Sequence, residues 1–124
     1  AYFEIFSGPG RSLLALSIRE GSATFFAEVI SGGSSHKNQA RTYLASHEAE
    51  LWQAFQKDMR SGETGDWLWK QPSNPEQPQD IGYAVGARIV EVFYENSADK
   101  GRAAREVMAI TDDLAFLERS GYAP

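Results

Sequence analysis

Residues 13–30 place apolar side chains on nearly every side of a helix, and this segment restricts the fold more than any other. At 3.6 residues per turn, one stripe of the helix holds Leu13, Leu16, Glu20, Ala23, Ala27 and Ile30. A second stripe holds Leu14, Ile18, Gly21, Phe25 and Val29. A helix that is apolar all round is normally buried, so we expect this one at the centre of the fold. Glu20 is then a carboxylate inside packed protein, where a charge persists only if it is paired, hydrogen-bonded or bound to a metal.

The composition is that of a globular protein. The chain has 124 residues, of which 42% are hydrophobic and 12% aromatic, enough to build one hydrophobic core. The net charge of -5 gives no electrostatic basis for binding nucleic acid. The absence of Cys excludes disulfides and thiolate metal ligands. No apolar run reaches the length of a transmembrane helix, so we expect no transmembrane segment.

The first residues suggest a piece of a longer protein. The chain begins with the hydrophobic segment 2–6, without an initiator Met or a signal peptide. This segment is either a short strand or the tail of an upstream element. We therefore expect residues 1–124 to form a single helical domain or the C-terminal part of a larger one. A fragment of that kind would expose an apolar face and would self-associate.

The pattern of apolar residues and helix-stop signals predicts an all-α fold with orthogonal or bundle-like packing. Helices are expected at about 11–30, 37–59, 81–96 and 100–109, and a fifth is expected from a cap within 111–113 to residue 120. Asp80 is a candidate N-cap, the run Thr111-Asp112-Asp113 caps the last helix, and Gly121 is a stop signal. The aromatic side chains of Trp67, Trp69 and Tyr94 are expected in the core.

The two histidines do not form a zinc site by themselves. His47-Glu48 opens like the HExxH motif, but the position of the second histidine is occupied by Leu51. The other histidine, His36, lies beside a Gly/Ser loop. Two histidines with no shared face make no metal site, so both are expected to be solvated.

Glu20 is followed by three small residues, Gly21-Ser22-Ala23, which leave one face of the helix bare. A second helix that approached this face could share a metal site with the unshielded carboxylate of Glu20. The alternative is an ion pair of Glu20 with Arg88 or Arg11, in which case the small residues serve ordinary helix packing.

A second segment of interest contains Gly82 and Gly86, one helical turn apart, which allow another close helix contact. Between and after them lie Tyr83 and Arg88, residue types that donate to a developing oxyanion or to a substrate carboxylate. Tyr83 and Arg88 are therefore candidate catalytic residues. The alternative is that Tyr83 packs in the core and that Arg88 pairs with Glu91, Glu20 or Asp80.

Several stretches, in this order, resemble the C-terminal part of a bacterial family of predicted zinc-dependent proteases akin to the gliding-motility lipoprotein B-like proteins. The stretches are Ser12-Leu13-Leu14, Ile18-Arg19-Glu20-Gly21-Ser22-Ala23-Thr24-Phe25, His47-Glu48-Ala49-Glu50-Leu51-Trp52, Phe55, Trp67-Leu68, Asp80-Ile81-Gly82-Tyr83, Gly86, Arg88-Ile89, Tyr94, Phe116-Leu117 and Ser120-Gly121-Tyr122. Each piece is weakly specific alone, and the ordered set, which covers about residues 11–123, is moderately specific.

Such families look like gluzincins, in which an HExxH helix supplies two zinc ligands and the general base, and a later glutamate supplies the third ligand. The resemblance implies that Glu20 is this third zinc ligand, that zinc-activated water attacks a peptide bond, and that Tyr83 and Arg88 contact the substrate. Two features depart from the pattern. HExxH is absent and is expected before residue 1, and Thr24 stands where an Asp often orients a ligating histidine.

The resemblance implies a peptide or protein substrate and a bacterial source, with either a cytoplasmic or a cell-envelope location. A non-catalytic helical domain that keeps the same scaffold and binds a protein or peptide is the alternative function.

Overall fold

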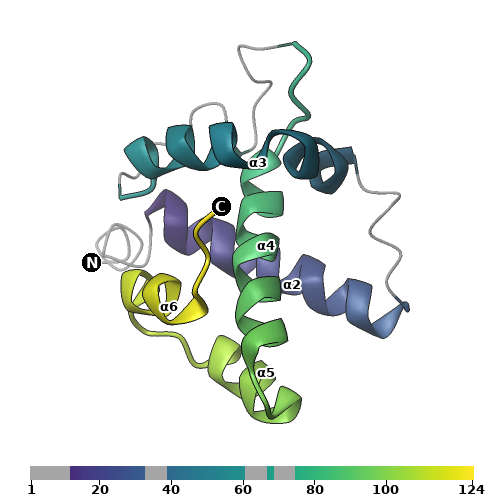
Figure 1. Cartoon of the computed structure of the whole chain (residues 1–124), viewed down its shortest axis with the longest axis vertical. Helices are drawn as coiled ribbons and strands as arrows, with labels where there is room; N and C mark the ends of the chain where they lie inside the picture. Colours follow the sequence, from purple (N-terminus) through teal and green to yellow (C-terminus); the bar gives the residue numbers. More distant parts are fainter. Residues whose placement is uncertain (1–11, 33–38, 61–66, 69–74) are drawn as a thin grey trace, which may run out of the picture.

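The computed structural model describes residues 12–32, 39–60, 67–68 and 75–124, and the regular secondary structure in this part of the chain is α-helical (Figure 1). The helices are α2 (Leu13–Ile30), α3 (Gln39–Asp58), α4 (Ile81–Asn96), α5 (Lys100–Met108) and α6 (Asp113–Ser120). The predicted all-α fold is confirmed. Segment 2–6, expected as a short strand or the tail of an upstream element, lies outside the described residues, as do Trp69 and His36. Among the described helices, none combines the length and the hydropathy that a membrane span requires.

The centre of the fold is the crossing of α2 and α4, which touch backbone to backbone (Figure 1). A Cβ atom built on Gly86 would lie 1.8 Å from the carbonyl oxygen of Ser17, and one on Gly21 would lie 2.2 Å from the amide nitrogen of Ala87. Real Cβ atoms do not approach other atoms so closely, so only glycine fits at these two positions. The two close contacts predicted from Gly21 and Gly86 are therefore one and the same contact.

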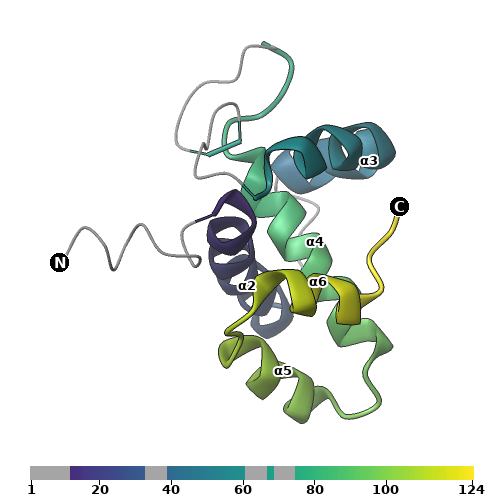
Figure 2. The ribbon, with the colours of Figure 1, turned by 90° about the vertical axis from the view of Figure 1, so that its left-hand side faces the viewer.

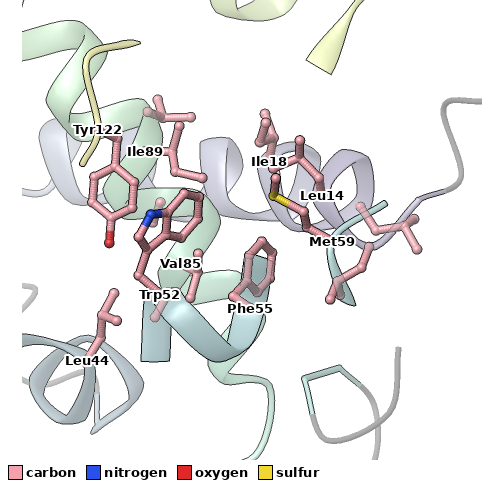
Figure 3. Packing of buried hydrophobic residues seen from close by; sticks show 14 of the residues in the cluster. Leu14, Ile18, Leu44, Trp52, Phe55, Met59, Val85, Ile89 and Tyr122 are labelled. Carbon is pink, nitrogen blue, oxygen red and sulfur yellow. The ribbon is translucent and has the colours of Figure 1, made fainter. Parts of the chain in front are cut away.

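Helix α3 covers one end of α4, and α5 and α6 lie toward the other end (Figure 2). The apolar face of α3 supplies the buried side chains Leu44, Leu51, Trp52 and Phe55, as the predicted amphipathic pattern requires. They meet side chains of α2 and α4 in a single core (Figure 3).

Of the aromatic residues predicted for the core, one described residue is buried and the other is only partly buried. Trp67 is buried and donates its indole N–H to Asp58 Oδ2 at 2.9 Å, whereas Tyr94 is half-buried at the edge of the core.

The helix ends follow the predicted signals, with one difference. Asp112 Oδ1 accepts a hydrogen bond from the amide of Ala115 at 3.1 Å, and Gly121 ends α6 at φ 77°. Asp80 also occupies an N-cap position, but it adopts a left-handed conformation with φ 63° and its side chain does not cap α4. Asp is one of the residue types that tolerate this conformation, so α4 begins from a tight turn instead of a side-chain cap.

The expected burial of α2 is correct only for its first half. Six consecutive residues, 13–18, are buried on every side of the helix, but after them only Gly21 and Phe25 are buried. Glu20 is exposed, so the prediction that its carboxylate lies in packed protein is wrong. Beyond residue 18 the described elements cover only the face of α2 that meets α4, and Glu20 projects from another face.

Replacing Gly86 with Ala tests the crossing. The added methyl group would collide with the main chain of Ser17, and we expect Gly86→Ala to lower the free energy of unfolding by about 3 kcal/mol or more. Gly101→Ala is the matched control, because a Cβ there meets its nearest atom at an ordinary 3.6 Å within the exposed helix α5. This control should raise the free energy of unfolding by about 0.5–1 kcal/mol. Urea denaturation of both variants measures the difference, and equal stabilities would contradict the crossing.

Ser17 offers a second test of the same contact. Its side chain is fully buried, and its hydroxyl oxygen has no hydrogen-bond partner among the described residues. An unsatisfied buried hydroxyl costs about 1–3 kcal/mol, so Ser17→Ala should stabilise the protein by about 1 kcal/mol. Calorimetric melting measures the effect, and a loss of stability would show that the hydroxyl has a partner in solution.

Candidate functional site

Helix α3 is broken at His47, and this break shapes the polar site. His47 has φ -133° and ψ 25°, outside the helical region. Its Nδ1 atom lies 3.0 Å from the carbonyl oxygen of Tyr43, and its ring stacks on the Tyr43 ring at 4.1 Å. A carbonyl only accepts, so Nδ1 donates to the Tyr43 oxygen. In a regular helix this oxygen, four residues earlier, is the acceptor for the His47 amide. The predicted solvation of His47 is wrong, because the ring is half-buried and bonded.

Glu48, the residue after the break, meets Arg88 of α4. Arg88 donates from Nε to Glu48 Oε2 at 3.0 Å and from Nη1 to Glu91 Oε1 at 3.0 Å. Burial lowers the pKa of Arg88, but the two carboxylates outweigh this effect and raise the pKa above its ordinary value. Of the three partners named for Arg88 in the alternative interpretation, Glu91 is the one observed to bond it, whereas the pair with Glu48 was not foreseen.

Arg41 joins the same cluster from the first half of α3. It donates from Nε and Nη2 to both carboxylate oxygens of Glu28 on α2, at 3.1 and 2.9 Å. Its Nη2 also lies 3.3 Å from Glu91 Oε1. The Arg41 and Glu28 side chains are only 9% and 12% exposed, so this two-pronged contact is the buried part of the cluster. Through it, three helices are connected by charge as well as by apolar packing.

Tyr122 completes the cluster from the C-terminal tail. Its hydroxyl donates to Glu48 Oε2 at 2.8 Å, and its ring packs edge-on against Trp52 at 4.9 Å (Figure 3). The left-handed turn at Gly121 and the hydrogen bond from the Tyr122 amide to Ser120 Oγ, 3.1 Å long, set the course of the tail. Burial, together with the hydrogen bond to Glu48, raises the pKa of Tyr122 well above its ordinary value of 10.0. No local pattern reveals this contact, because it joins residues 74 positions apart.

These side chains line an open cavity of about 410 Å³ between α3 and α4. Arg41, Glu48, Arg88 and Glu91 form its charged walls, and Leu44 and Ala45 contribute apolar surface. A cavity with an apolar wall and a few fixed charges is suited to bind a small charged group.

The three residues predicted from the sequence as site residues occupy three different environments. Glu20 is exposed on α2, Tyr83 is half-buried against the core, and Arg88 lines the charged cavity. The hydroxyl of Thr24 donates to the main-chain oxygen of Glu20 at 3.2 Å, so it serves the helix backbone. Within the described residues no three His, Asp or Glu side chains are grouped to hold a metal ion. Neither a protein-family model, nor a curated protein, nor a solved structure matches this chain.

Replacing Tyr122 with Phe tests the contact of the tail with Glu48. We expect Tyr122→Phe to cost about 1.5–3 kcal/mol of unfolding free energy at neutral pH, the range for a hydrogen bond to a charged group. The raised pKa means that the folded protein holds the phenolic proton more tightly than the unfolded chain. The contribution of Tyr122 to stability is therefore complete below pH 10.0 and is lost as the pH rises above it.

Urea titrations at increasing pH should show the stability difference between the original protein and Tyr122→Phe shrinking above pH 10.0. Tyr94→Phe is the control, since its ring lies at the edge of the core and makes no contact with Glu48. A difference that stays constant with pH would contradict the hydrogen bond.

Proposed function

We propose that this chain supplies the third zinc ligand, Glu20, to a metallopeptidase-like domain whose HExxH helix lies in a segment outside these residues. In that longer protein, zinc-activated water would hydrolyse a peptide bond. The observation that carries the proposal is the position of Glu20, exposed on the uncovered face of α2 and directly beside the Gly21–Gly86 crossing.

The uncovered face leaves room for a second helix. Ala23 and Ala27 lie on the same stripe as Glu20, and both are exposed. Their small side chains do not shield the carboxylate, so a helix carrying two histidines could approach it closely. A zinc ion held by two histidines and one glutamate keeps its fourth position open for water, which a hydrolase requires.

The crossing also holds Glu20 in place. Its neighbour Gly21 is fixed against the backbone of Gly86 and Ala87, so the main chain at Glu20 has little freedom to move. Catalytic ligands act best from rigid elements, because a small displacement weakens the geometry of the metal. Glu20 is therefore next to a backbone contact that leaves no room for a side chain.

The roles of Arg88 and Tyr83 are less direct. Arg88 is 34% exposed at the wall of the cavity, where it could contact a bound peptide. Tyr83 lies in the first turn of α4 and packs against the core, which favours a supporting role. The charged cavity also favours a second candidate, a non-catalytic peptide-binding domain, because a peptide could bind to its charged walls without a metal ion.

Metal analysis of the full-length protein tests the role of Glu20. We expect about one zinc ion per chain, and we expect Glu20→Gln to weaken zinc binding by about tenfold or more, since a lost ligand should cost at least as much as a lost outer-shell partner. Glu50→Gln is the control, because Glu50 is also an exposed glutamate but lies on α3; this variant should keep the metal. Equal zinc content in both variants would exclude Glu20 as a ligand.

The 124-residue chain by itself should not bind zinc tightly, because a single exposed carboxylate is a weak ligand set. Calorimetric titration with zinc measures this, and a stoichiometric tight site in this chain would contradict the proposed sharing of ligands.

A further inference from the structure

We propose that the cavity between α3 and α4 is a binding site for a cationic amine, of the kind that a lysine side chain carries. Three features of the cavity favour such a ligand: the balance of charge, the carboxylate oxygens that are left without donors, and the shape of the walls.

The charge balance favours a cation. The buried Arg41–Glu28 contact, with two hydrogen bonds, is a neutral pair. Arg41 also reaches Glu91, so the cluster as a whole has two arginines, Arg41 and Arg88, against three glutamates. The two glutamates at the partly exposed wall are Glu48 and Glu91, which are 23% and 25% exposed. Carboxylates are therefore in excess where a ligand would enter, and a positive group reduces that excess.

The hydrogen bonds leave two oxygens available. Glu48 accepts both Arg88 Nε and Tyr122 Oη on one oxygen, Oε2. Glu91 likewise uses one oxygen, Oε1, for its contacts with Arg41 and Arg88. Glu48 Oε1 and Glu91 Oε2 thus receive no hydrogen bond from the described residues. An ammonium group has three donors and no acceptor, which matches a wall with unused acceptors.

The same contacts weaken the case for an anion. Arg88 is already engaged through Nε and Nη1, and Arg41 is engaged through Nε and Nη2. An anion would have to lie beside the carboxylates of Glu48 and Glu91, and their repulsion would oppose its binding.

The walls also suit the rest of a lysine side chain. The cavity volume of about 410 Å³ lies within the range of small-ligand sites. Ala45 is exposed at the wall in front of the buried Leu44, so a methylene chain can pack against it while its charged end reaches the carboxylates.

The acceptors are held in place before any ligand arrives. Glu48 is fixed by Arg88 from α4 and by Tyr122 from the tail, and Glu91 is fixed by two arginines. A site whose groups are already oriented loses less conformational entropy when it binds. The involvement of Tyr122 makes the C-terminal tail part of the site.

The binding site does not depend on zinc or on Glu20. Only its biological role rests on the proposed function: in a peptidase it would receive a basic side chain of the substrate, and in a binding domain it would receive one from the partner. Amine binding by the 124-residue chain can therefore be present whether or not the zinc proposal is correct.

The test is a titration of the ¹⁵N-labelled 124-residue chain, monitored by NMR, with three probes. The probes are N-acetyl-lysine methylamide, its uncharged norleucine analogue and N-acetyl-glutamate methylamide. We expect the lysine probe to shift the amide signals of Thr42, Leu44 and Ala45 in a saturable manner that added salt weakens. The norleucine and glutamate probes should cause no saturable shift.

Glu91→Gln keeps the shape of the side chain but removes its charge, and it should weaken binding of the lysine probe by about fivefold, the order expected for one exposed ion pair. Glu95→Gln, one turn later on α4 and exposed, is the matched control and should bind as the original chain does. Tighter binding of the glutamate probe, equal binding of all three probes, or no saturable binding of the lysine probe would overturn the proposal. Unchanged affinity in Glu91→Gln would also overturn it, and circular dichroism of each variant checks that the helices persist.

Discussion

The fold depends on the backbone contact of α2 with α4 at Gly21 and Gly86. Two helices that touch through glycine come closer than side chains normally allow, so the crossing point is fixed along both helices. This geometry determines which faces of α2 are covered: the face toward α4 is closed, and beyond residue 18 the opposite face has no cover among the described elements. The exposure of Glu20 therefore follows from the crossing.

The ion pairs of the charged cluster also hold the helices together, in addition to the backbone contact. The crossing brings Glu28 on α2, Arg41 and Glu48 on α3 and Arg88 on α4 to one region, where ion pairs connect all three helices. Partly buried pairs contribute little net stability, because desolvation offsets much of their attraction, but an unpaired member would be costly. The cluster is therefore better understood as a device that fixes the relative positions of the helices and orients the cavity wall.

The sequence predicted local features well and long-range ones poorly. Helix positions, a cap within the run 111–113 and the stop at Gly121 follow from residues close together in the chain, and the small residues correctly indicated a tight helix contact. The break at His47 was missed because a local departure from helical backbone angles, with the ring bonded to Tyr43 O, leaves no mark in the periodicity of apolar residues. The Tyr122 contact was missed because only the folded chain brings the tail to α3.

Glu20 is exposed instead of buried, and this changes the physical reason for assigning it a role. As a buried charge it would need a partner to offset the energetic cost of desolvation, whereas an exposed glutamate carries no such cost. The energy of burial therefore gives no reason to assign it a function, and the proposed role rests on its position alone. It projects from a rigid point of the backbone, on a stripe with two exposed alanines, whereas Glu28, Glu48 and Glu91 have arginine partners. A carboxylate that the described fold does not use, held steady and left accessible, is suited to bind something that the fold itself does not contain.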